Sequence, residues 1–166
     1  MFREMRRGRQ QLSGEECRAV LRRGTSGVLA VTGDDGYPYA VPLSYVYADS
    51  KLFFHCARAG HKLDAIARSD KASFCVIDQD QVVPEDYTSY FRSVIAFGRA
   101  RVLEQEREKR AALELLAARY FPQDERGRLE EIARQYDRVA MVELAIEHMS
   151  GKEALELRAP GPFHDA

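Results

Sequence analysis

The stretch LFFHCARAGHKLD, residues 52–64, carries a strand-like run, a glycine turn and the start of a helix. The predicted helix opens on His61 and Lys62, although a helix N-terminus already has unpaired N–H donors and the positive end of the backbone dipole. Two potential cations at that point indicate a bound anion, most simply a phosphate. They can equally be solvated surface residues, because the arrangement costs only roughly 0.3–1 kcal/mol for each.

The residues before this stretch predict a helix and a hairpin. Ser13 and Glu16 have the spacing of a capping box, and the helix that follows should end at about Arg23. Residues 27–32 form a near-continuous apolar run typical of a buried strand, and a turn rich in glycine and aspartate joins them to a second strand over 37–47. Two prolines interrupt that second strand, so we expect it to be irregular or to lie at a sheet edge.

The residues after this stretch predict strands that alternate with helices. Residues 78–90 have no clear period and contain a proline, so we expect a long loop there. Gly98, in the middle of a predicted strand, suggests a bulge or a close backbone approach. The predicted elements are strands over 72–77, 93–103 and 138–147, and helices over 60–68, over 106–120 and after residue 127.

Together these patterns predict a mainly β domain with helices, of the α+β class. Six strands joined mostly by hairpin-length turns favour an antiparallel barrel with helical covers. A doubly wound parallel sheet is disfavoured, because the first three strands follow one another without room for crossover helices. A chain of 166 residues is expected to form one domain over 1–166.

Composition excludes several classes of partner. The formal net charge of −1 argues against a nucleic-acid or membrane-surface binder, and no apolar run approaches the ~20 residues that span a bilayer. No signal-peptide core is present near the N-terminus, and the three cysteines (Cys17, Cys56 and Cys75) are odd in number and spaced unlike a disulfide or zinc framework. We therefore expect a cytoplasmic location and no metal. No Ser-His-Asp order or Walker-type loop is visible.

Several short segments match one family in its own order. They are GVLAV (27–31), PYAVPLSY (38–45), FFHCA (53–57), GHKLD (60–64), SVIAFGRA (93–100) and SGK (150–152). Over about residues 12–157 the chain resembles the FMN-binding split-barrel family related to pyridoxamine 5′-phosphate oxidase, and within it the nitroimidazole-resistance (Nim-type) flavoprotein branch. The resemblance implies a six- to seven-stranded antiparallel split β-barrel of Greek-key type, with peripheral helices and flexible N- and C-terminal tails.

The same resemblance implies a homodimer with FMN at the subunit interface. The strand over 41–44 would lie along the isoalloxazine ring, residues 55–58 would flank the ribityl chain, and a basic pair would hold the phosphate. His61 stands where relatives commonly have arginine, so we expect a weaker, pH-dependent phosphate contact. The implied cofactor-binding residues are Val41, Pro42, Leu43, Ser44, His55, Cys56, Ala57, Arg58, His61, Lys62, and, from the partner subunit, Ser93 and Val94.

Two of these residues have ordinary structural interpretations as well. His55 can be a hydrogen-bonded core histidine, and Arg58 is equally well explained as a surface ion-pair partner. The C-terminal segment 152–158 is acidic and lacks tryptophan, so the resemblance does not extend to vitamin B6 chemistry. No catalytic residue is assigned.

The function that the resemblance implies is an FMN-dependent oxidoreductase. It would reduce a small organic substrate such as a nitroaromatic, with a nicotinamide as the possible electron donor, while the protein supplies binding and orientation. The alternatives are a non-enzymatic flavin- or haem-binding module, and a dimeric scaffold that has lost its ligand.

Overall fold

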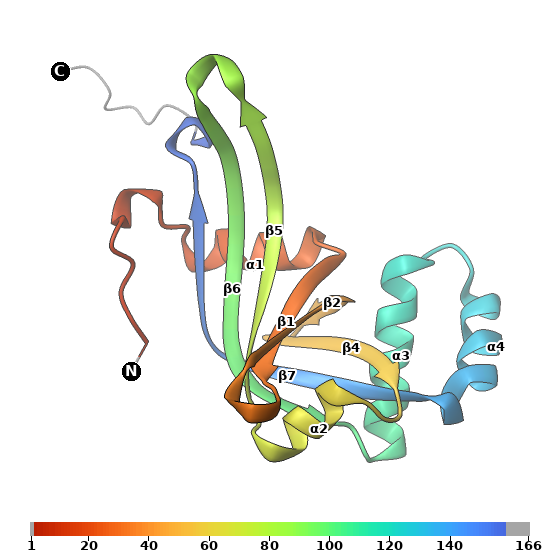
Figure 1. Cartoon of the computed structure of the whole chain (residues 1–166). Helices are drawn as coiled ribbons and strands as arrows, with labels where there is room; N and C mark the ends of the chain where they lie inside the picture. The colour runs from red at the N-terminus through yellow and green to blue at the C-terminus, as the bar shows by residue number, and fades with distance from the viewer. Residues whose placement is uncertain (1, 159–166) are drawn as a thin grey trace.

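The computed structural model describes residues 2–158 and shows a strongly curved sheet with helices on several sides (Figure 1). The strands are β1 (Ser26–Thr32), β2 (Pro38–Ser44), β3 (Val46–Ala48), β4 (Lys51–Ala57), β5 (Lys71–Val83), β6 (Thr88–Val102) and β7 (Val139–Glu153). The helices are α1 (Gly14–Arg23), α2 (His61–Arg68), α3 (Glu106–Tyr120) and α4 (Glu125–Gln135).

All strand pairs are antiparallel, in the order β2-β1-β5-β6-β7-β4-β3. The curvature brings β2 into contact with β4, although the two strands lie in opposite halves of this order. The sheet therefore forms an incomplete barrel, with α2 packed against β1 and β6. The predicted antiparallel split barrel with peripheral helices is confirmed.

Strand β2 lies at one end of the sheet order, as its prolines predicted. Pro38 pairs with Thr32 of β1, and Pro42 pairs with Val28. Because proline has no N–H to donate, the ladder with β1 can continue through both positions only where the proline nitrogens face away from β1. The outer edge of β2 therefore lacks N–H donors at Pro38 and Pro42.

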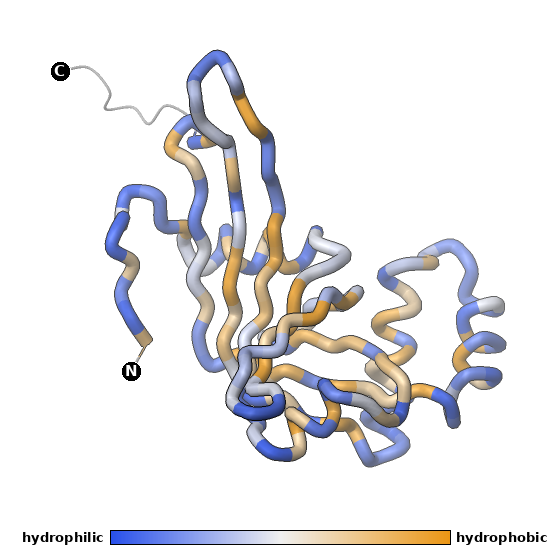
Figure 2. The backbone as a smooth tube through the Cα atoms, in the orientation of Figure 1, coloured by the Kyte–Doolittle hydropathy of each residue, from blue (hydrophilic) through white to orange (hydrophobic). Residues whose placement is uncertain are grey.

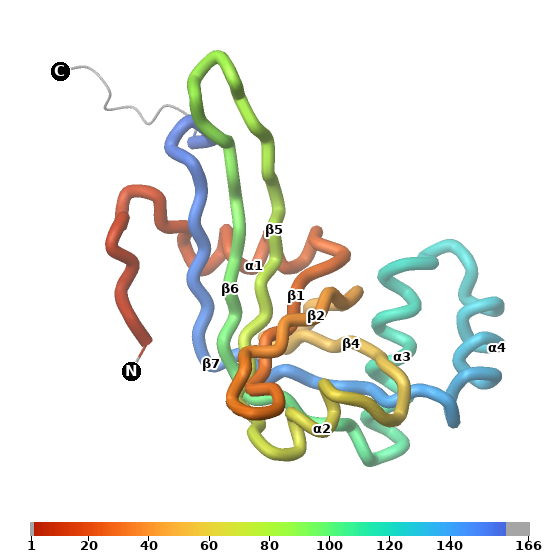
Figure 3. The backbone as a smooth tube through the Cα atoms, in the orientation of Figure 1, coloured from red at the N-terminus to blue at the C-terminus, as the bar shows by residue number. Residues whose placement is uncertain are grey.

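The prediction of a loop over residues 78–90 is wrong. Strands β5 and β6 continue through this region as one long hairpin, with Gln79 paired to Arg92 and Val83 paired to Thr88. The hairpin projects beyond the rest of the sheet (Figures 1 and 3), and its tip is a short 3₁₀ turn at Pro84–Asp86. A hairpin with both faces near water needs no apolar alternation, so the period that marks a half-buried strand is missing here.

Strand β7 is also longer than predicted, because it runs past residue 147 to Glu153 and pairs with β6. Gly98 of β6 lies at a register shift in this pairing, as expected. A Cβ atom on Gly98 would overlap the backbone oxygen of Ala145. Only glycine allows the two backbones to approach so closely.

The helix starts follow the local sequence. Ser13 Oγ accepts from the backbone N–H of Glu16 at 3.2 Å, and the Ser13 N–H donates to the Glu16 carboxylate at 2.6 Å, so the predicted capping box is confirmed. Helix α4 begins slightly before Gly127 rather than after it. Its N-cap is Asp124, whose carboxylate accepts from the Gly127 N–H at 2.8 Å.

The buried apolar side chains form two clusters. One fills the barrel and the space beneath α1, and it includes Leu29, Phe54 and Phe74. The other lies between α3, α4 and the outward face of β4 and β7, around Met141. Figure 2 shows apolar residues gathered where the central strands meet and polar residues at the hairpin tip. Helices α3 and α4 therefore cover the outer face of only one half of the sheet.

At the N-terminal end, the ring of Phe2 stacks on His148 of β7, with ring centroids 4.5 Å apart. The flexible tail predicted at this end stays a prediction, and the one predicted after Arg158 lies outside the described residues. Within residues 2–158, no helix is both long and apolar enough to cross a membrane.

Candidate functional site

The first turn of α2 exposes unpaired backbone donors. Gly60 precedes the helix with a φ of 132°, and no side chain caps the helix. The N–H groups of Leu63 and Asp64 donate to the Gly60 carbonyl, at 2.9 and 3.2 Å. Those of His61 and Lys62 have no acceptor within the described part of the chain. Two free amides beside the Lys62 side chain form the kind of helix terminus that binds an anion.

The imidazole of His61 is held from two sides. Its ring stacks on Tyr39 of β2 at a centroid distance of 4.1 Å, and its Nε2 lies 3.5 Å from the Asp34 carboxylate. Asp34 also accepts from Arg68 at 2.8 Å. Nε2 is buried there and makes no hydrogen bond with the described residues, so Nδ1 is the nitrogen that a ligand can reach. Sequence reasoning missed this role of Tyr39 and Asp34, since nothing in the pattern shows that the β1–β2 turn meets α2.

Strand β4 places its predicted site residues on two faces. His55 and Ala57 are exposed, whereas Cys56 is buried in the barrel, where burial raises the pKa of its thiol. Arg58 follows the strand, and its guanidinium donates to the carbonyl of Asp137 at 3.1 Å. Of these four residues, His55 and Ala57 lie on the outward face of β4, where His55 lines a pocket together with residues of α3 and α4.

Strand β2 alternates in the same way. Val41 and Leu43 pack against the barrel core, while Pro42 and Ser44 are exposed. Because β2 has a neighbour on one side only, part of its backbone N–H and C=O groups remain unpaired. This edge can offer backbone hydrogen bonds to a flat ligand.

Ser93 and Val94 lie elsewhere in the sheet. Strand β6 is three places from β2 in the strand order, roughly 14 Å at ~4.8 Å per strand. Val94 is 0% exposed, so its side chain belongs to the core, and Ser93 faces outward. Helix α2 packs on the other end of β6, where Arg99 pairs with Lys71, and Ser93 lies six residues before Arg99, roughly 20 Å away at ~3.3 Å per residue. One chain therefore does not bring these two residues next to α2.

The outward face that β1, β2, β5 and β6 share is uncharged over most of its area. Its exposed or half-buried side chains include Val28, Ala30, Pro42, Ser73, Cys75, Ile77, Ser93, Ile95 and Phe97. Ile77 is 65% exposed and Ile95 is 37% exposed. Contiguous apolar surface of this kind marks an interaction site.

A comparison with models of protein families shows which family this chain belongs to. Residues 13–153 match the family model described as pyridoxamine 5′-phosphate oxidase. The chain belongs to this family. A comparison with curated proteins found no match to the chain.

Solved structures share the fold of this family member at low sequence identity. A candidate 5-nitroimidazole antibiotic resistance protein from Bacteroides thetaiotaomicron matches with a TM-score of 0.71 and 18% identity over 86% of each chain. The flavocytochrome Anf3 from Azotobacter vinelandii matches with a TM-score of 0.77 and 20% identity, over 98% of this chain and 75% of that one. A FAD- and haem-binding protein from Mycobacterium smegmatis matches with a TM-score of 0.73 and 22% identity, over 87% and 73%.

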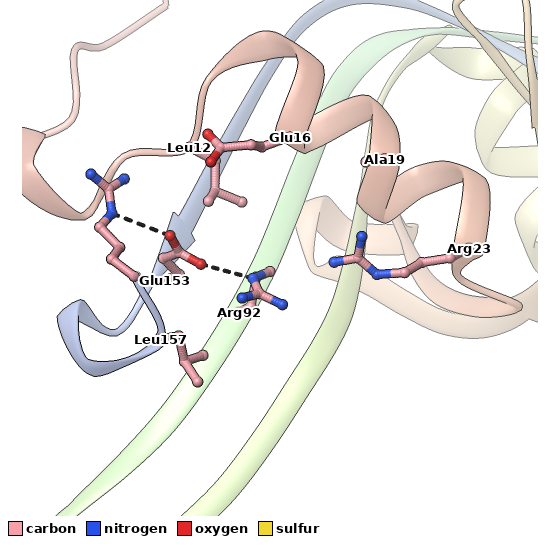
Figure 4. Close-up of a pocket in the computed structure, with 8 residues that line it drawn as sticks. Leu12, Glu16, Ala19, Arg23, Arg92, Glu153 and Leu157 are labelled. Carbon is pink, nitrogen blue, oxygen red and sulfur yellow. Dashed lines mark hydrogen bonds and ion pairs between the residues drawn. The ribbon is translucent and has the colours of Figure 1, made fainter. Parts of the chain in front are cut away.

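A concave region lies between α1 and the ends of β6 and β7 (Figure 4), with a volume of about 460 Å³. Glu153 accepts from Arg92 at 2.8 Å and from Arg158 at 3.2 Å. Asp78 accepts from Arg23 at 2.6 Å and from Arg92 at 3.1 Å. Each guanidinium is thus paired with a carboxylate, and Glu16 of α1 lines the same region, so three carboxylates stand against three guanidiniums. This network joins α1 to β5, β6 and β7 and leaves no unbalanced charge for a ligand.

Proposed function

We propose that the chain is a flavin-dependent oxidoreductase that holds FMN by its phosphate at the start of α2. The observation that carries the proposal is the pair of unpaired N–H groups of His61 and Lys62 at the start of a helix whose second residue is a lysine. A dianionic phosphate satisfies both donors and balances the added charge. The names of two similar structures, a flavocytochrome and a FAD- and haem-binding protein, support a flavin ligand.

The residues of the chain have defined parts in this arrangement. The edge of β2 offers backbone hydrogen bonds to the ring, with Pro42 and Ser44 facing it, and His55 and Ala57 border the linking chain. FMN, when bound, supplies the redox chemistry. The protein's part is to bind, orient and exclude water, so no side chain is assigned as a general acid or nucleophile.

A homodimer completes this site. Ser93 is too far from α2 to reach the same ligand within one chain, but it lies on the uncharged sheet face together with Pro42 and Ser44. Packing that face against a second copy would bury it and carry Ser93 of the partner subunit toward the ring. The dimer and the interfacial flavin are therefore one proposal.

The substrate we propose is a small organic molecule such as a nitroaromatic, reduced at the expense of a nicotinamide donor. The similarity to the candidate 5-nitroimidazole resistance protein supports the nitroaromatic class. A cytoplasmic location fits the cysteines, since Cys17, Cys56 and Cys75 are all free thiols.

The test is the absorption spectrum of the purified protein, followed by mass spectrometry of what denaturation releases. We expect a flavin spectrum, FMN as the released species, and oxidation of reduced nicotinamide when a nitro compound is added. A flavin that stays bound but is never reduced would support the non-enzymatic module instead, and release of FAD would correct the cofactor. A haem Soret band without flavin would overturn the proposal.

A further inference from the structure

Helices α3 and α4 lie beside β4 and β7, on the side of the sheet that they cover (Figure 1). Residues of both helices and of these strands line an open pocket there. Its volume is about 520 Å³, within the 300–1,000 Å³ typical of small-molecule sites. Most of its wall is apolar and comes from Leu113, Leu116, Ala117, Ile132 and Val139. The pocket is thus large enough for an organic molecule and is lined to favour an apolar one.

The polar groups of the wall are mostly already paired. The hydroxyl of Tyr120 accepts from the Tyr45 N–H at 3.1 Å and donates to a backbone carbonyl. Glu131 accepts from Arg134 at 2.9 Å, and this pairing lowers the pKa of its carboxyl. No lysine or arginine lines the pocket within the described part of the chain. An anionic ligand would therefore find no counter-charge, so the occupant is uncharged.

Two lining residues connect this pocket to the flavin surface. Ser44 belongs to the edge strand β2, and His55 belongs to the outward face of β4. Neither side chain has a hydrogen-bond partner among the described residues. A ligand in the pocket would present its polar end to these two groups at the border of the proposed flavin site.

We infer that this pocket is the substrate site, and that the substrate is an uncharged aromatic molecule of one or two rings. The inference rests on the proposed flavin function and adds to it the place and the chemical class of the substrate. The apolar wall from α3 and α4 holds the ring system. The imidazole of His55 donates a hydrogen bond to a nitro or carbonyl oxygen at the open end.

The test uses the full-length protein as purified, with 4-nitrotoluene as the probe. Calorimetric titration should show saturable binding, and methyl NMR spectra should show shifts at Leu113, Leu116 and Ile132 but not at the barrel residues Leu29 and Val76. Ala117→Phe fills the pocket and should weaken binding at least tenfold. Ala111→Phe makes the same change on the exposed face of α3 and should leave binding unchanged.

Bound flavin is measured in every sample, which separates this inference from the proposed function. Loss of probe binding in Ala117→Phe with unchanged flavin content supports the inference. Probe binding that is absent from the wild type, unaffected by Ala117→Phe, or accompanied by shifts at other methyl groups overturns it, and so does haem in the pocket. Should Ala117→Phe fail to fold, the wild-type shifts decide. Absence of flavin from a protein that still binds the probe overturns the proposed function alone.

Discussion

Lys62 and His61 stand side by side at the start of α2, but they are held differently. His61 is fixed between Tyr39 and Asp34, whereas the Lys62 ammonium has no ion-pair partner among the described residues. We therefore expect Lys62→Ala to weaken FMN binding by about tenfold or more, and His61→Ala to weaken it less. Quenching of FMN fluorescence measures both affinities. Arg107→Ala removes an exposed cation from the first turn of α3 and serves as the control. Unchanged affinity in the His61→Ala/Lys62→Ala double variant would contradict the phosphate site.

Gly98 gives a second prediction at the level of a single residue. Its Cβ position is occupied by the backbone oxygen of Ala145, so Gly98→Ala must push two strands apart. We expect a loss of at least about 2 kcal/mol in the free energy of unfolding, measured by urea denaturation. Gly8→Ala is the matched control, because no atom lies within 4 Å of its Cβ position. Equal stability of the two variants would show that the strands separate without cost.

At the level of single residues, the sequence showed which residues are functionally or structurally important, but it did not show which residues they contact. The basic pair, the glycine turn and Gly98 were recognisable because each is unusual for its local structure. The stacking of Tyr39 on His61 and the bond from Arg58 to Asp137 were not, because each joins segments far apart in the chain. Whether the twelve cofactor-binding residues contact FMN stays a prediction.

Among the elements, the β5–β6 hairpin depends on Asp78, which is nearly buried between Arg23 and Arg92. Asp78→Asn should lower the free energy of unfolding by about 1–3 kcal/mol at pH 7. Hydrogen bonds from Arg23, and then from Arg92, hold the pKa of this carboxyl below its ordinary value of 3.8. The stabilisation is therefore complete above about pH 4 and is lost as the pH falls through the lowered folded pKa.

Urea denaturation at a series of pH values tests this prediction. The difference in stability between wild type and Asp78→Asn should shrink as the pH falls below about 4. Asp80→Asn, on the exposed side of the same strand, should have little effect at any pH. A difference that stays constant down to pH 2 would mean that the carboxylate charge is not what stabilises the hairpin.

This hairpin also shows which strands could not be predicted from the sequence. Helices α1 and α3 were predicted nearly to the residue, because capping and a 3.6-residue apolar period mark them locally. The outer half of β5 and β6 mixes Asp, Gln and Arg with a few apolar residues in no regular period, and the ion pair between Asp78 and Arg23 of α1 ties it to the rest of the fold. Such pairs are invisible until the fold brings the partners together.

For the whole molecule, the proposed assembly predicts a solution mass of twice the chain mass by sedimentation equilibrium. Ile95→Glu puts a charge into the uncharged sheet face and should give monomers that also lose FMN. Leu129→Glu places the same charge on exposed α4 and should change neither property. Dimers that persist in Ile95→Glu with full flavin content would show that this face is not the interface.

The overall architecture was predictable from the order of strand-like segments and from the family resemblance, and it is confirmed. The strand order was not predicted, because neighbouring strands such as β4 and β7 are separated by a long segment of chain. The uncovered face of the sheet could not be predicted either, because it depends on α3 and α4 packing against the other half.

The prolines of β2 have a consequence for how copies of this chain can meet. An ordinary edge strand invites another chain to extend the sheet, which is the first step toward fibrils. Pro38 and Pro42 turn their nitrogens to that edge, so an incoming strand would find donors missing at two positions out of four. Growth by strand addition is thereby blocked at this end of the sheet, and the concentrated protein is guarded there against amyloid-like polymerisation.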